Sequence, residues 1–206
     1  MKIFEKQEFP DISKYHKIGL TIGSAVLSFV FPLFFRNTLH LPVFLDQIGN
    51  VLISVTAGPY WALLTAVLLV VMRVIIISPL QVTSILTFAM GAIVFSYMAK
   101  YGWTKTWPRL VVTMLLYIFV LSVGSATTTT LTYGGYTGDS WDIAVAAMAK
   151  MTNNIWSSVF VVNFFTSMYD KVIVVLIVLA ILRSLPPMYR KLTPIAAKSK
   201  TNVANA

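Results

Sequence analysis

The sequence predicts an all-α integral membrane protein with six transmembrane helices and a short helix on the outer membrane surface before the last of them. The first observation behind this prediction is the composition: of 206 residues, 57% are hydrophobic and 11% are charged, and the mean hydropathy is +0.79. Soluble domains have about 45–50% apolar and about 25% charged residues. The other two observations are the spacing of the apolar stretches and the placement of the basic residues.

Six apolar stretches approach the length of about 20 residues that a helix needs to cross a bilayer. The second and third are separated only by Gly58-Pro59, a turn so tight that the two helices are expected to be antiparallel neighbours. The segment 142–154 is expected to form the short surface helix. The expected spans, in chain order, are 18–35, 42–57, 59–77, 82–99, 110–131 and 155–182.

The basic residues predict the orientation. With six spans, twelve Lys and Arg fall on the side of the two termini, and only Arg36 and Lys150 fall on the other. Because membrane proteins collect Lys and Arg on the cytoplasmic side, both termini are expected to be cytoplasmic, and the net charge of +9 needs no nucleic-acid partner. The chain then divides into a cytoplasmic lead-in (1–17), a membrane domain (18–187) and a basic tail (188–206) that is expected to be disordered.

Missing residue types argue against several classes of function. The chain has no cysteine, which excludes disulfides and thiolate metal sites. Its two histidines, His16 and His40, lie on opposite sides of the first expected span and cannot share a metal. There is no Gly-x-x-x-x-Gly-Lys-Ser/Thr phosphate loop for ATP, and no serine has a histidine nearby to activate it. We therefore expect no enzyme activity, no metal site and no cofactor in this chain.

Four charged residues lie within the expected spans: Asp46, Arg73, Asp170 and Lys171. An ionised side chain there costs about 2.5–3.5 kcal/mol on insertion scales, so such groups pair or serve a function. Neighbouring residues on a helix point about 100° apart, and Asp170 and Lys171 therefore cannot both face one cavity. Two interpretations remain open. The charges pair only to hold the helices in register, or Asp46 and Arg73, together with Asn50, face a water-filled outer cavity that binds a solute.

The segment TTTTLTYGGYTGDSWD, residues 127–142, follows the fifth expected span on the outer side. Its hydroxyls and flat amphipathic rings suit an aromatic or bulky solute, and three asparagines and a tryptophan beyond it (Asn153, Asn154, Asn163 and Trp156) fall on the same side. The alternative is an interfacial loop with aromatic anchors, which membrane proteins commonly have. The candidate solute-binding residues from this region are Thr130, Tyr133, Tyr136, Trp141, Asn154 and Asn163.

Small residues four apart in two spans indicate close helix contacts. Gly19 and Gly23 lie in the first expected span, and Ala62 and Ala66 repeat the spacing in the third. Such residues let another helix approach closely. The partner is either a second membrane protein or another helix of this same chain.

The order of several motifs resembles one family. The pattern Leu-Pro-x-Phe-Leu-Asp-x-Ile-Gly at 41–49 is followed by Gly-Pro-x-Trp-Ala at 58–62 and by Tyr-Gly-Gly-x-Thr-Gly at 133–138. Asn163, Asp170-Lys171 and a closing Leu185-Pro186 come after them. Over residues 17–187 the chain resembles the substrate-binding S components of energy-coupling factor (ECF) transporters, which are bacterial importers of micronutrients.

The resemblance implies a substrate-binding subunit in the bacterial cytoplasmic membrane. Such a subunit captures a vitamin outside the cell and docks on a membrane coupling protein that carries two cytoplasmic ATPases. In the family, small residues of the first span face the coupling protein; Gly19 and Gly23 match two positions of that pattern, whereas Leu27 departs from it. The first expectation for the solute is cobalamin, and the second is a nucleoside or base-like compound.

Three other classes of function remain. A membrane sensor would bind a solute without transporting it. A structural subunit would have an outer cavity too small for any solute. A solitary transporter would act without ATPases, and uptake in cells that lack those ATPases would identify it.

Overall fold

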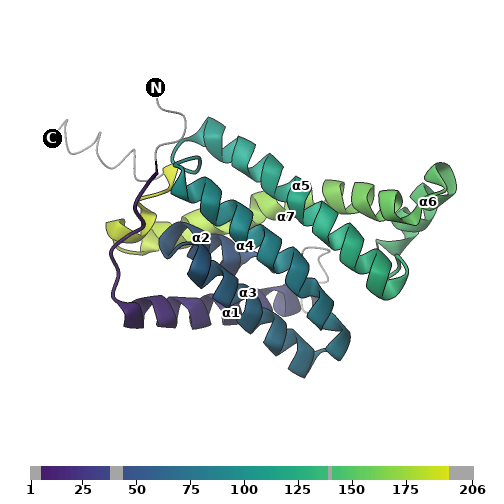
Figure 1. Cartoon of the computed structure of the whole chain (residues 1–206), viewed down its shortest axis with the longest axis horizontal. Coiled ribbons are helices and arrows are strands. Elements are labelled where there is room, and N and C mark those ends of the chain that lie inside the picture. Colours follow the sequence, from purple (N-terminus) through teal and green to yellow (C-terminus); the bar gives the residue numbers. More distant parts are fainter. Residues whose placement is uncertain (1–5, 38–43, 139–140, 195–206) are drawn as a thin grey trace.

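The computed structural model describes residues 6–37, 44–138 and 141–194. In these residues every regular element is a helix, so the all-α prediction is confirmed there. Short turns connect α2 to α3 and α6 to α7 (Figure 1). In chain order the elements are α1 (Lys14–Asn37), α2 (Ile48–Thr56), α3 (Pro59–Ile76), the 3-10 helix η1 (Pro79–Ser84), α4 (Ile85–Lys100), α5 (Trp107–Tyr133), α6 (Asp142–Thr152), α7 (Ile155–Ser184) and the 3-10 helix η2 (Pro187–Arg190).

Five helical segments of the described chain are long and apolar enough to cross a membrane: Lys14–Phe35, Pro59–Ile76, Pro79–Lys100, Trp107–Tyr133 and Ile155–Ser184. They make the chain a multi-pass membrane protein. The second expected span, 42–57, has no helix of that length. Its described part contains α2, whose nine residues rise about 14 Å at 1.5 Å per residue, and residues 42–43 lie outside the described chain.

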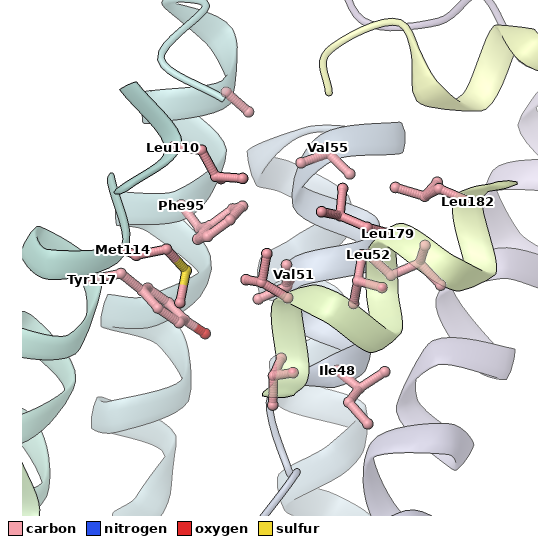
Figure 2. Close-up of a cluster of buried hydrophobic side chains, with 14 of the residues drawn as sticks. Ile48, Val51, Leu52, Val55, Phe95, Leu110, Met114, Tyr117, Leu179 and Leu182 are labelled. Atoms are coloured by element: carbon pink, nitrogen blue, oxygen red, sulfur yellow. The ribbon is translucent and has the colours of Figure 1, made fainter. Parts of the chain in front are cut away.

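α2 is the centre of the bundle. All nine of its residues are buried, and its three polar side chains, those of Asn50, Ser54 and Thr56, have hydrogen-bond partners inside the bundle. Around it, α1, α3, α4, α5 and α7 form an arc in which each helix packs on the next. The last helix of the arc, α7, also packs on α2. Figure 2 shows how Val51, Leu52 and Val55 of α2 meet Leu179 and Leu182 of α7, with side chains of α4 and α5 on the other side.

The terminal segments meet at one end of the bundle. The first turn of α1 and the last turn of α7 lie at the same end, and α6 lies at the opposite end (Figure 1). The Gln7 N–H donates to the Lys100 carbonyl at 2.6 Å, and Thr104 Oγ1 donates to the Leu192 carbonyl at 2.5 Å. Groups expected on the cytoplasmic side are thus gathered at this end, which is called the terminal end below.

The expected disordered tail differs from what the structure shows for its first part. Leu192 is fully buried and Thr193 is 3% exposed, and η2 packs on α2 and α7. Burial of an apolar side chain such as that of Leu192 against the end of the bundle is favoured in free energy over its exposure to water. Residues 188–194 therefore belong to the folded unit, and residues 195–206 lie outside the described chain.

The turn between α2 and α3 is the one that the sequence predicts. Gly58 has φ +93°, a conformation that side chains other than glycine rarely adopt. Pro59 starts α3, where its missing N–H costs nothing. The ring of Phe9 lies directly against Gly58, so the lead-in covers the turn.

Candidate functional site

A cavity of about 400 Å³ lies in the half of the bundle away from the terminal end. α1, α3, α4, α5 and α7 contribute to its wall, as do η1 and the residues that precede α2 and α6. Aromatic side chains line it together with hydroxyls and amides. Of the nine predicted solute-binding residues, five line the cavity: Asp46, Arg73, Tyr133, Trp141 and Asn163.

The four charges that the sequence placed inside the spans form one network. Asp46, just before α2, forms ion pairs with the Arg73 guanidinium of α3 at 3.4 Å and with the Lys171 ammonium of α7 at 3.2 Å. Lys171 also contacts Asp170 at 2.6 Å. The Lys171 side chain is 7% exposed and that of Asp170 is 1% exposed. Two cations and two carboxylates thus cancel, which is how a membrane interior tolerates charge.

Asp170 and Lys171 point in different directions, as their adjacent positions on a helix require. Lys171 lines the cavity, and Asp170 does not. Instead, Asp170 Oδ1 accepts the backbone N–H groups of Phe44 and Leu45 at 2.9 and 3.0 Å. Leu45 has φ +45°, an uncommon conformation for a residue with a branched side chain, and this carboxylate holds the backbone there. The chain before α2 is thereby fixed to α7.

A second polar network lies behind Asp46. Tyr117 of α5 donates its hydroxyl to Gln47 Oε1 at 3.1 Å, and Asn50 Nδ2 donates to the same oxygen at 2.8 Å. Tyr117 is fully buried and stacks edge-on against Phe95 of α4, with ring centroids 5.1 Å apart. Gln47 lines the cavity, whereas Asn50 does not. The predicted solute-binding role of Asn50 is therefore corrected: it supports Gln47, because it faces the core one turn deeper.

Arg73 lies over an aromatic floor. Its guanidinium carbon is 4.8 Å from the centre of the Phe88 ring, a distance at which a cation is attracted to the ring face. Among the described residues, the one hydrogen-bond partner of Arg73 is Asp46, at 3.4 Å. A guanidinium carries five N–H donors, so most of the Arg73 donors are free for a bound molecule.

Three other predicted residues also lie outside the cavity wall. The Tyr136 side chain is 45% exposed. Asn154 precedes α7, where its side chain accepts the Ser157 N–H at 3.0 Å and caps the helix. The Thr130 hydroxyl is buried and has no partner within the described chain, on a face of α5 away from the cavity. The polar loop therefore contributes Tyr133 and Trp141, which fall on the inward side.

Several lining residues were not predicted as solute-binding. Gln47 and Lys171 are polar residues inside apolar stretches, and that signal was present in the sequence. Ser125 of α5 and Thr87 of α4 gave no such signal, because a lone hydroxyl in a span can be satisfied by its own helix. Thr128 lies in the polar segment 127–142, whose hydroxyls were predicted to suit a solute, but only Thr130 of its four consecutive threonines was predicted to bind one; Thr128 Oγ1 donates to the Gly124 carbonyl at 3.0 Å.

The small residues predicted to face a coupling protein separate into two pairs. Ala62 and Ala66 of α3 are fully buried inside the bundle, so they cannot meet a partner, and this part of the prediction is corrected. Gly19 and Gly23 of α1 are exposed, and a Cβ added to either would meet nothing within 4 Å. The outer face of α1 is thus free for another helix.

The described residues contain no group of three His, Asp or Glu side chains that could hold a metal. The two carboxylates of the buried network are occupied by Lys171, Arg73 and backbone N–H groups. What the arrangement can do chemically is bind: it offers cationic donors, hydroxyls, amides and aromatic faces around one space. Comparisons of the chain with protein-family models, curated proteins and solved structures find no match.

Proposed function

We propose that this chain is the solute-binding subunit of an ATP-driven micronutrient importer of the ECF type. The observation that carries the proposal is the cavity itself, whose wall contains charged, hydroxyl and amide side chains: ionisable residues inside a membrane helix bundle are rare, pair with one another and commonly mark a solute or ion site. A cavity of about 400 Å³ lies within the range of small-molecule sites, about 300–1,000 Å³. The sequence carries no phosphate loop, so energy would come from partner ATPases through a membrane coupling protein.

The proposal includes a topology. The chain crosses the bacterial cytoplasmic membrane six times, with α2 in the second crossing, and both termini are cytoplasmic. Supporting this, the first turn of α1 and the last turn of α7 lie at the same end of the bundle (Figure 1), where the Lys and Arg of the α4–α5 loop also lie. The cavity then faces the outside, where a solute is captured.

The size of the cavity favours the smaller of the two solutes that the sequence suggested. Cobalamin is a corrinoid with a nucleotide tail and is several times larger than a nucleoside. A space of about 400 Å³ suits a nucleoside or base-like compound, whose flat ring can lie against Tyr133 and Trp141 of the wall. Cobalamin would need the wall to open substantially.

The first test identifies the solute directly. We expect protein purified in mild detergent from cells grown in rich medium to release one small molecule at near equimolar amount, as detected by mass spectrometry. The control is Asn163→Leu, which fills the cavity wall with an apolar side chain and is expected to release none. A protein that is empty, and stays empty when vitamins and nucleosides are added, would contradict the proposal and favour a structural subunit.

A second prediction concerns the coupling protein. Gly23→Leu places a bulky side chain on the exposed face of α1, and it should abolish uptake of the solute in cells without changing its binding to the purified protein. A matched control is Val111→Phe, which adds bulk on α5 at a side chain that is 56% exposed. Normal uptake by Gly23→Leu, or loss of binding together with uptake, would contradict a docking role for this face.

A further inference from the structure

We infer that the solute is a net-neutral, planar heterocycle with a carbonyl-type acceptor that is bound by Arg73 above Phe88. This inference rests on the proposed solute-binding function and names the class of solute. It follows from the charge balance of the cavity and from the donors and acceptors that its wall leaves unused.

Every charged residue of the described wall already has a partner, which disfavours a solute with net charge. Asp46 neutralises Arg73, and Asp170 neutralises Lys171, within contacts of 2.6 to 3.4 Å. Asp142, the remaining charged residue of the wall as far as the structure describes it, is held by the backbone N–H groups of Thr137 and Gly138 at 3.2 and 2.7 Å and lies in the first turn of α6, where a helix favours an anion. Among the described residues an added anion or cation would therefore meet no unpaired counter-ion, and pairing it would break an existing ion pair, which is costly.

The unused donors lie at the Arg73 end. Arg73 has five N–H groups and one long hydrogen bond, to Asp46 at 3.4 Å. Its position above the Phe88 ring, 4.8 Å from the centre, leaves the edge of the guanidinium available to the cavity. A carbonyl oxygen suits this edge, because it accepts hydrogen bonds without bringing a charge.

The unused acceptors lie across the cavity, on α5 and α7. Asn163 gives its amide nitrogen to Ser125 Oγ at 2.9 Å, so its oxygen is left to accept. Thr128 gives its hydrogen to the Gly124 carbonyl, which leaves its oxygen lone pairs. Both residues line the cavity. Donors on one side and acceptors on the other match a flat ring that carries a carbonyl at one edge and N–H groups at another.

The test uses small probes of equal shape and different charge. Binding of nicotinamide (neutral), nicotinate (anionic) and N1-methylnicotinamide (cationic), and of uracil against its carboxylated analogue orotate, is measured on the purified full-length protein by calorimetry at pH 7.4. We expect wild type to bind nicotinamide and uracil at least about tenfold more tightly than the charged probes, because an uncompensated buried charge outweighs one hydrogen bond.

Two variants shift the charge balance in opposite directions. Asp46→Asn leaves one cation in excess and should bind nicotinate in preference to nicotinamide. Arg73→Gln leaves one carboxylate in excess, keeps Asp46 paired with Lys171, and should lose about tenfold in nicotinamide affinity while gaining affinity for N1-methylnicotinamide. Because both carboxylates of the network still contact Lys171 in the second variant, it tests the inference even if the first does not fold.

The outcomes separate the inference from the proposed function. Equal or tighter binding of nicotinate or orotate by wild type, or an unchanged preference in both variants, overturns the net-neutral class and leaves solute binding intact. Failure of every probe to bind wild type also overturns the inference. In that case a solute released from purified protein still supports the proposed function, and an empty protein removes both.

Discussion

Lys171→Met is expected to lower the free energy of unfolding by about 3–5 kcal/mol, the usual cost of removing one partner of a buried ion pair. Lys171 contacts Asp170 at 2.6 Å and Asp46 at 3.2 Å. Methionine fills a similar volume but carries no charge, so Asp170 would be left without a cation and Asp46 would keep only Arg73. SDS titration of the protein in mild detergent, followed by tryptophan fluorescence, measures the change.

A double variant distinguishes charge from packing. Asp170→Asn combined with Lys171→Met leaves Asp46 and Arg73 as a balanced pair, and the amide oxygen of residue 170 can still accept the N–H groups of Phe44 and Leu45. We therefore expect the double variant to recover most of the stability that Lys171→Met alone loses. If it is as unstable as the single variant, the ammonium group acts through its shape, and the neutral network proposed for the cavity is wrong.

The buried charges were the part of the site that the sequence predicted best. Asp46 and Arg73 are far apart in the chain, yet both line the cavity and contact each other. The reason is physical: in an apolar surrounding each charge needs an opposite one, so a small number of charges has few arrangements. A hydroxyl can be satisfied by the carbonyls of its own helix and carries no such constraint, so nothing in the sequence distinguished Ser125 or Thr128 as a lining residue.

The phase of the outer end of α5 could not be predicted from its composition. Four consecutive threonines, 127–130, point in all directions around a helix at about 100° per residue. α5 continues to Tyr133, beyond the expected end at 131, and this continuation sets which hydroxyls turn inward. Thr128 and Thr129 line the cavity, and Thr130 does not.

An apolar pattern could not predict where α2 lies in the bundle. The sequence of a largely apolar segment is much the same whether lipid or protein surrounds it. The sequence therefore predicted a span at 42–57, where the described chain has a nine-residue helix buried by its neighbours. Ala62 and Ala66 show the same ambiguity, since small residues permit close approach to any helix, and here that helix belongs to the chain itself. Asn154, by contrast, carried a readable signal: asparagine directly before an apolar helix is a common cap.

Gly49→Ala is expected to destabilise the protein by about 3 kcal/mol, at the upper end of the usual range for overpacking a core. A Cβ at Gly49 would lie 2.0 Å from the Ser24 carbonyl oxygen and 2.7 Å from Ser28 Oγ. The first of these atoms is backbone and cannot rotate away. α1 would have to retreat by more than about 1 Å to restore ordinary contact, near 3.5 Å, and the hydrogen bond from the Gly49 N–H to Ser28 Oγ, now 2.7 Å, would be lost.

The matched control, Gly23→Ala, should change the stability of the protein in the opposite direction. Gly23→Ala on α1 meets nothing within 4 Å, so it should stabilise the helix by about 0.5–1 kcal/mol through helix propensity alone. Gly49→Ala has the same gain in helix propensity, so a net loss of stability in that variant must come from the contact between α1 and α2.

Because Asp46 and Gln47 directly precede α2, a shift of α2 away from α1 also moves both residues relative to Arg73 and Lys171. Gly49→Ala should therefore weaken solute binding as well, whereas a variant that is stable and binds normally would show that α1 and α2 are not locked together here.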